Sequence, residues 1–214
     1  MKRLIFILLV TIPFAGISQQ KFNLRNLLEN GKVKVYNRTA TLSDDASKEA
    51  IYLTEAAGEG IAWLNGVNFS EGTIEVDLKG KDEYQKSFIG IAFHGQNDST
   101  YDAVYFRPFN FRTTDSVRHI HAVQYISHPQ YPWKKLRDEQ NAKYEKEVNP
   151  APDPNQWFHA RIVVKNDQVA VYVDGAQKPS LTVQKLNKNK NGAIGLWVGD
   201  GAGGTFANLS ITQK

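Results

Sequence analysis

The 214-residue sequence has no cysteine and a single methionine. The absence of cysteine excludes disulfide bonds, a cysteine nucleophile and a lipid anchor attached through cysteine within these residues. A Gly-x-Ser-x-Gly motif is also absent, so acyl transfer by a serine nucleophile has no support. No segment repeats apolar residues at helical spacing over the length of an ordinary helix, so little helix is expected.

Long hydrophobic runs are limited to the N-terminus, where residues 4–14 are almost entirely apolar. A basic start precedes this run and a small-residue end follows it, which is the pattern of a secretory signal peptide. The run is too short to span a bilayer, although a retained anchor is the alternative. We expect cleavage near Ser18, removal of residues 1–18, and a secreted or periplasmic domain formed by residues 19–214.

Charge of one sign is not concentrated anywhere in the chain. The formal charge is +4, and removal of Lys2 and Arg3 leaves 24 basic and 22 acidic residues. The basic residues are scattered, so we predict no nucleic-acid interface. Aromatic residues are plentiful, with 4 Trp, 9 Tyr and 11 Phe, and some of them are available to stack on a ligand. Nothing in the pattern specifies an oligomeric state.

Alternation of apolar and polar residues, the strand period, dominates the remaining chain. It is clear in TIEVDLKG (73–80), SFIGIAFHG (87–95), YDAVYFRP (101–108) and RHIHAVQYI (118–126). A hairpin with its turn at Asn166-Asp167 follows in WFHARIVVKNDQVAVYVDG. About twelve short strands in one domain predict a sandwich or a barrel.

Residues 127–156 interrupt this rhythm and contain five of the eight prolines. A long insertion between strands is either functional or disordered, and disordered segments are poor in aromatic residues. Tyr131 and Trp133 therefore predict an ordered, functional insertion. A short helix between Lys134 and Glu147 is expected, without a clear apolar stripe.

Three stretches carry a resemblance to a known superfamily: GTIEVDLKG with SFIGIAFHG, NQWFHARIVVKNDQVAVYVDG, and GAIGLWVGDGAGGTFANLSI. They resemble the concanavalin A-like jelly roll of legume lectins, laminin G domains and family 16 glucanases. Residues 30–214 are most similar to the secreted bacterial 3-keto-disaccharide hydrolase-like domain. The resemblance implies an all-β sandwich of two antiparallel sheets that holds a glycan on its concave face, either as an enzyme or as a lectin-like or adhesive module. The fold alone does not choose between them.

Glu75 and Asp77 lie two residues apart and face the same way in the predicted strand. Family 16 glucanases place Glu-x-Asp-x-(x)-Glu on such a strand, but Lys79 and Gly80 occupy the positions of the third carboxylate. A retaining glycosidase needs two carboxyl groups, so the glucanase mechanism is not expected. Glu75 remains a candidate catalytic base, and the alternative is that both carboxylates are solvated residues on a polar strand face.

In the predicted strand 101–108, Tyr105 and Arg107 point to one face, and Val104 and Phe106 point to the other. Arginine offers a rigid fork of donors for vicinal hydroxyls or a carboxylate, and tyrosine offers an apolar face with a polar tip. The resemblance implies that this face is the concave one, so both residues are expected to bind the substrate. A surface salt bridge is the alternative for Arg107.

His119 and His121 are two residues apart in the predicted strand 118–126. Such a pair can hold a metal with a third ligand such as Glu75, or it can be a polar pair that faces ligand or solvent. We predict no metal site and take His121 as the second catalytic candidate. Strand alternation places Gln124 on the other face from His121, whereas the resemblance implies that Gln124 lies in the site, so both are kept as candidates.

Trp133 and Arg137 complete the expected substrate contacts, because an indole stacks on the apolar face of a sugar ring. The alternative is that Trp133 pins the insertion to its own domain. Trp157 and Trp197 look structural from their positions in strands. The stretch GDGAGG (199–204) is expected to be a tight turn; no cofactor is predicted, and a structural calcium at Asp200 is an alternative.

Overall fold

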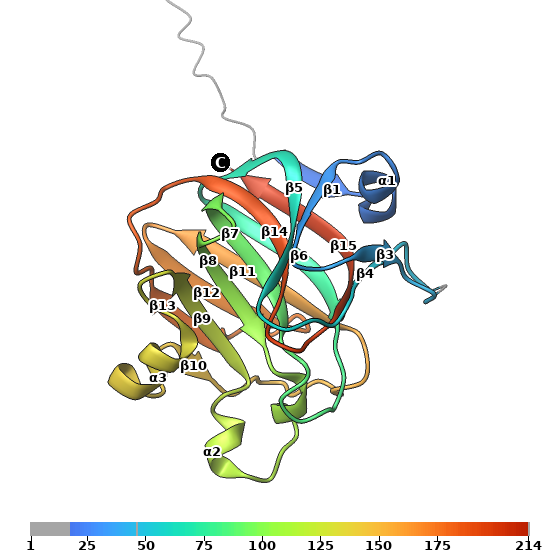
Figure 1. The fold of residues 1–214 in the computed structure, drawn as a ribbon. Helices are drawn as coiled ribbons and strands as arrows, with labels where there is room; N and C mark the ends of the chain where they lie inside the picture. Colours follow the sequence, from blue (N-terminus) through green and yellow to red (C-terminus); the bar gives the residue numbers. More distant parts are fainter. Residues whose placement is uncertain (1–17, 46, 214) are drawn as a thin grey trace, which may run out of the picture.

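Alternating apolar and polar residues build two antiparallel sheets that pack face to face (Figure 1). The computed structural model describes residues 18–45 and 47–213. The expected signal peptide lies outside these residues, except for Ser18, which begins strand β1. The predicted all-β sandwich is confirmed.

Sheet A is the first of the two sheets. In spatial order its strands are β13 (Leu181–Gln184), β12 (Gln168–Val173), β11 (Phe158–Lys165), β6 (Gly72–Lys79), β15 (Gly204–Gln213), β4 (Ile51–Leu53) and β3 (Ala40–Leu42). β1 (Ser18–Phe22) also pairs with β15.

Sheet B is the second sheet and carries the insertion at one edge. In spatial order its strands are β10 (Glu145–Lys146), β9 (Val123–His128), β8 (Thr100–Phe106), β7 (Ile89–Asn97), β14 (Gly192–Val198), β5 (Gly60–Phe69) and β2 (Val33–Tyr36). The helices of the described residues are α1 (Leu24–Glu29), the 3₁₀ helix η1 (Pro108–Asn110), α2 (Ser116–His119) and α3 (Trp133–Gln140).

The hydrophobic core lies between the two sheets, as the strand alternation predicts. β6 contributes Ile74, Val76 and Leu78, all fully buried. From sheet B, Phe106 meets the ring of Phe158 of β11 edge-on, with ring centroids 5.1 Å apart. Burial of each such side chain stabilises the fold by about 1.5–3 kcal/mol relative to exposure.

The predicted hairpin of β11 and β12 is confirmed. Lys165 pairs with Gln168, which leaves a two-residue turn. Asn166 and Asp167 both have positive φ, 49° and 60°, as a type I′ turn requires. The described residues nevertheless hold fifteen strands rather than about twelve, because very short edge strands such as β3 and β10 are too short to show alternation.

The prediction of one strand over residues 118–126 is wrong in its first half. The carboxylate of Asp115 accepts hydrogen bonds from the backbone N–H groups of Val117 and Arg118 and so caps α2. β9 begins only at Val123. A side-chain cap therefore starts a helix where the alternation of RHIHA suggested a strand.

This break changes the interpretation of the two histidines. His119 ends α2 and does not share a strand face with His121. His121 precedes β9, so its direction is independent of the alternation that places Gln124. The conflict between His121 and Gln124 disappears, and both can face the same side.

The insertion is ordered and forms part of sheet B. α3 falls largely within the predicted helical range but begins at Trp133 and ends at Gln140. β10 pairs with β9 at the edge of the sheet, with Glu145 opposite Gln124 (Figure 1). This pairing places a charged segment, which lacks the alternation of a strand, against the edge of the sheet.

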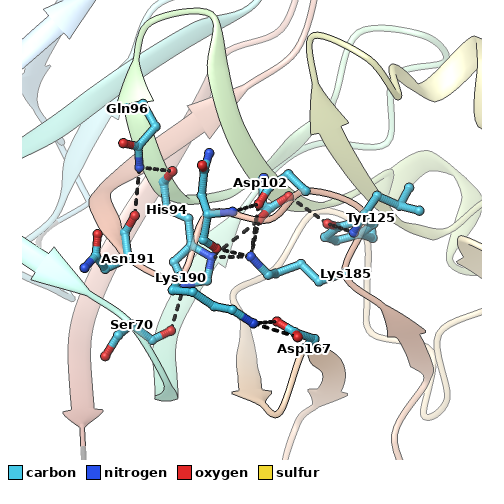
Figure 2. Close-up of polar contacts among 12 residues, drawn as sticks. Ser70, His94, Gln96, Asp102, Tyr125, Asp167, Lys185, Lys190 and Asn191 are labelled. Atoms are coloured by element: carbon cyan, nitrogen blue, oxygen red, sulfur yellow. Dashed lines mark hydrogen bonds and ion pairs between the residues drawn. The ribbon is translucent and has the colours of Figure 1, made fainter.

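A buried polar cluster joins sheet B to the connection between β13 and β14 (Figure 2). Lys185 Nζ lies 3.2 Å from His94 Nδ1 and 3.6 Å from Asp102 Oδ2, and Tyr125 donates to Asp102 Oδ1 at 2.7 Å. His94 Nε2 lies 2.7 Å from the carbonyl oxygen of Ser70. Since Nε2 donates to that carbonyl, Nδ1 is left to accept from the Lys185 ammonium. Burial lowers the pKa of Lys185.

We expect the substitution Lys185→Met to lower the free energy of unfolding by about 3 kcal/mol, because it leaves Asp102 as a buried charge without a cation. Urea denaturation measures the loss. The double variant Lys185→Met/Asp102→Asn is the control, and it should recover part of the lost stability. A single variant as stable as the parent would show that the cluster does not hold the connection in place.

Candidate functional site

A pocket of about 380 Å³ opens on the outer face of sheet B, the face turned away from sheet A. Its walls come from loops at the ends of the strands and from α3. The lining residues are Glu59, Tyr84, Gln85, Phe88, Tyr105, Arg107, Phe109, Asn110, Arg118, His121, Trp133, Arg137, Trp197, Gly199 and Asp200. The volume falls within the range typical of small-molecule sites.

The floor of the pocket is aromatic. Tyr105 of β8 and Trp197 of β14 lie on either side of Gly90 of β7 in the strand register. Their ring centroids are 4.7 Å apart and their planes are inclined by 36°. A Cβ atom at position 90 would lie 2.1 Å from the carbonyl oxygen of Val104 and 2.7 Å from Cβ of Tyr105, so only glycine fits between these strands here. Trp197, which looked structural in the sequence, is part of the site.

Tyr105, Arg107 and Gln124 form one hydrogen-bonded group above this floor. Arg107 Nη2 donates to the Tyr105 hydroxyl and to Gln124 Oε1, both at 2.5 Å, and Tyr105 donates to the same Oε1 at 2.7 Å. The register of β8 and β9 places Tyr105 directly opposite Gln124. Burial raises the pKa of Tyr105 to about 12, so its hydroxyl stays protonated at neutral pH. These predicted site residues are thus neighbours.

Glu145 of β10 is the central anion of the site, and sequence reasoning did not find it. Its carboxylate accepts from Arg137 Nε at 3.1 Å and Nη2 at 2.7 Å. Oε2 also lies 2.8 Å from His121 Nδ1 and 3.7 Å from Arg107 Nη1. The side chain is only 2% exposed. Nothing distinguishes Glu145 in a segment rich in charges, because its position depends on the pairing of a two-residue strand.

His121 is placed to act as a base. Its Nδ1 faces the Glu145 carboxylate, which favours the proton on Nδ1 and leaves the Nε2 lone pair free. Burial lowers the pKa of His121 below its ordinary value, and the Glu145 charge opposes this effect. The imidazole is therefore neutral near pH 7, which is the form that accepts a proton.

Trp133 and Arg137 form the rim of the pocket on the side of the insertion. The guanidinium of Arg137 lies 5.1 Å from the centroid of the Trp133 ring, a cation–π distance. Trp133 is 42% exposed, and its backbone carbonyl accepts a hydrogen bond from Gln124 at 3.4 Å. The predicted contacts from the insertion therefore reach the same pocket as those from β8 and β9.

Glu75 does not belong to this pocket, and its expected place in one groove with His121 is wrong. It lies on β6 of sheet A, opposite Arg161 of β11. Because Ile74 and Val76 fill the core from sheet A, Glu75 faces solvent on the far side of the sandwich from sheet B. Alternation showed correctly that Glu75 points away from the core. It did not show to which of the two sheets the strand of Glu75 belongs.

The outer face of sheet A instead carries a network of ion pairs around Asp77. Asp77 Oδ2 accepts from Lys48 at 2.5 Å, and Oδ1 lies 2.7 Å from His159 Nδ1. His159 Nε2 lies 3.5 Å from Glu75 Oε1. Although burial acts to raise it, hydrogen bonds from His159, Lys48 and Asn208 hold the pKa of Asp77 well below its usual range. The carboxylates of TIEVDLKG are therefore neutralised within their own sheet.

The pair of His159 and Asp77 makes stability depend on pH. Hydrogen bonding to Asp77 raises the pKa of His159 above its unfolded value of about 6.5. Protonated His159 stabilises the fold fully below that value, and the stabilisation is lost as the pH rises through the higher folded pKa. We expect His159→Gln to reduce the free energy of unfolding more at about pH 6 than at about pH 9 in urea denaturation.

The matched control is His119→Gln, which removes a histidine that forms no ion pair within residues 18–45 and 47–213. At about pH 6, the loss caused by His159→Gln should exceed the loss caused by this control. Equal losses for His159→Gln at both pH values would contradict the assigned charge state of the pair.

No group of three or more His, Cys, Asp or Glu side chains within the described ranges is arranged to hold a metal ion. Asp200, the candidate for calcium, accepts a hydrogen bond from the backbone N–H of Gly58 at 2.6 Å. None of the described helices combines the length and the apolar character that crossing a bilayer requires.

The two packed antiparallel sheets, with a pocket on the outer face of one, define a concanavalin A-like β-sandwich protein. The family model for the 3-keto-alpha-glucoside-1,2-lyase-like domain matches residues 44–212, and the chain belongs to this family. No curated protein sequence matches the chain significantly.

Solved structures share the fold at low sequence identity. Carbohydrate binding module CBM66 from Bacillus subtilis is 15% identical with a TM-score of 0.56, over 86% of this chain and 92% of that chain. A protein of unknown function with a galectin-like fold from Bacillus subtilis is 10% identical with a TM-score of 0.61, over 91% and 94%. The exoplasmic/lumenal domain of VIP36, bound to Ca²⁺ and Man3GlcNAc, is 12% identical with a TM-score of 0.56, over 86% and 84%.

Proposed function

We propose that this chain is an exported carbohydrate-processing domain that binds a sugar in the pocket of sheet B and cleaves glycosides that carry a ketone at C3. The observation that carries the proposal is the convergence on one pocket of an aromatic floor, Tyr105 and Trp197, with the oriented imidazole of His121. Family membership supports the reaction class, and the N-terminal pattern supports export.

The aromatic floor suits the apolar face of a sugar ring. Tyr105 and Trp197 line the base of the pocket, each 2% exposed, and Trp133 adds an exposed indole at the rim. Asn110, Arg107 and Arg137 supply hydrogen-bond donors around the floor. A mostly aromatic surface with a few fixed polar groups is the usual composition of a small-molecule site.

The proposed cleavage needs one base and no second carboxylic acid. A ketone at C3 makes the proton on C2 acidic, and Nε2 of His121 removes that proton to form an enolate. The electron pair then forms a double bond between C1 and C2 and expels the C1 oxygen, which takes a proton as it leaves. Glu75 faces the other side of the sandwich, and we assign the role of base to His121, whose Nδ1 faces the Glu145 carboxylate.

A non-catalytic lectin-like module is the second candidate. It is favoured by the hydrogen bonds that Tyr105, Arg107 and Gln124 already make with one another, since such a preformed platform binds sugars without further chemistry. The two candidates share the pocket and differ only in whether a bound 3-keto glycoside is consumed.

Incubation of the protein with methyl 3-keto-α-glucoside, followed by NMR, tests the proposal. We expect release of methanol with formation of an unsaturated ketone. His121→Gln should lower the rate by about 10²–10⁴-fold while leaving binding intact. The rate should be level at neutral pH and fall only below the ordinary histidine pKa, because burial lowers the pKa of His121 and protonation removes the base.

The matched control is His159→Gln, which removes a histidine from the outer face of sheet A and should leave the rate unchanged. Binding of the glycoside without turnover would assign the lectin-like function. Absence of both binding and turnover across a panel of neutral and acidic glycosides would refute a carbohydrate site in this pocket.

A further inference from the structure

We propose that the sugar held in this pocket carries a carboxylate, as a uronic acid glycoside does. The inference rests on the proposed function, because it names the chemical class of ligand for the same pocket. It is carried by an excess of positive charge at the end of the pocket that Arg107, Arg118 and Arg137 line.

The charges at that end do not balance. Within the described residues, Glu145 is the carboxylate that pairs with these arginines, and both of its oxygens accept hydrogen bonds from Arg137. Arg107 lies farther from it, at 3.7 Å, and Arg118 forms no ion pair within the same part of the chain. With His121 neutral, three guanidinium groups line an end of the pocket where the single charge of Glu145 is shared between Arg137 and Arg107, which leaves an excess of positive charge.

Arg107 is the more buried of these two cations, at 5% exposure. Its donors go to neutral acceptors, namely the Tyr105 hydroxyl, the Gln124 amide and the backbone carbonyl of His121. Because Arg107 shares Glu145 with the closer Arg137, its buried charge is only partly compensated, and a bound anion offsets the remaining cost. Arg107 lies at the inner wall of the pocket, where an anionic ligand would compensate its charge.

Arg118 is held in the same frame. It donates to Asn110 Oδ1 at 3.2 Å, and Asn110 in turn donates to the carbonyl oxygen of His121 at 3.2 Å. That carbonyl also accepts from Arg107 at 2.9 Å. The ring of Tyr84 supports the Arg118 guanidinium from one side at 4.5 Å. Asn110 therefore links the two arginines, because it accepts from Arg118 and donates to the carbonyl oxygen that also accepts from Arg107.

Two carboxylates line the other end of the pocket. Glu59 and Asp200 line it from the loops before β5 and after β14, across β7 from the arginines. These carboxylates repel an anionic group and attract hydroxyl donors. A sugar ring in the pocket is thus oriented with its carboxylate toward Arg107 and Arg118 and its hydroxyl groups toward Glu59.

A carboxylate is the anion that suits this wall, because planar guanidinium groups pair with planar carboxylates in fixed geometry. Calorimetric titration with methyl glucuronide and methyl glucoside tests the inference. We expect the glucuronide to bind about tenfold more tightly or better, equivalent to about 1.4 kcal/mol. This preference should shrink as salt is raised, because salt screens the charge.

Variants separate the pocket charge from the overall charge. Arg118→Gln should remove most of the preference for the glucuronide, while Arg161→Gln, which deletes the same charge on the outer face of sheet A, should leave it unchanged. Arg107→Gln should also weaken the preference for the glucuronide. If that variant does not fold, Arg107→Lys replaces it; because this variant retains the charge, its preference for the glucuronide should still fall as salt is raised.

Equal or tighter binding of the neutral glucoside would overturn the inference and leave the proposed carbohydrate function standing. An undiminished preference in Arg118→Gln would overturn it as well. Failure of both glycosides, and of a wider glycan panel, to bind would refute the proposed function itself.

Discussion

The buried carboxylate of Glu145 is the interaction on which the candidate site depends. It lies between cationic or ionisable groups from three segments: Arg107 at the end of β8, His121 before β9, and Arg137 on α3. Without an anion among them, the two guanidinium groups would repel each other at short range in a buried place. The pairing of β10 with β9 attaches this anion to the sheet, so a two-residue strand determines the geometry of the pocket.

The two outer faces of the sandwich have different chemistry, because one carries paired charged side chains and the other carries aromatic rings beside a glycine. On sheet A, β6 and β11 place charged side chains opposite one another, and these side chains form ion pairs among themselves. On sheet B, Gly90 leaves space over β7, so aromatic rings from neighbouring strands meet above the backbone.

Alternation predicted the sandwich, the core residues of β6 and the shared face of Tyr105 and Arg107. It did not show which sheet a strand joins, and so Glu75 and His121 were placed together although they lie on opposite sides. It failed at RHIHA because Asp115, a cap outside the pattern, starts α2 there. Glu145 could not be found from the sequence, since its position comes from a pairing too short to leave a periodic signal.

The edge position of the insertion has a consequence for how such a protein changes over time. Trp133, Arg137 and Glu145 all belong to a segment that enters and leaves sheet B beside β9, with no strand beyond β10 in the described sheet. Replacement of this segment would alter the rim of the pocket, Trp133 and Arg137, together with the anion Glu145. The fold can therefore acquire new ligand preferences by exchange of one peripheral segment, while the aromatic floor and Arg107 remain as a common base.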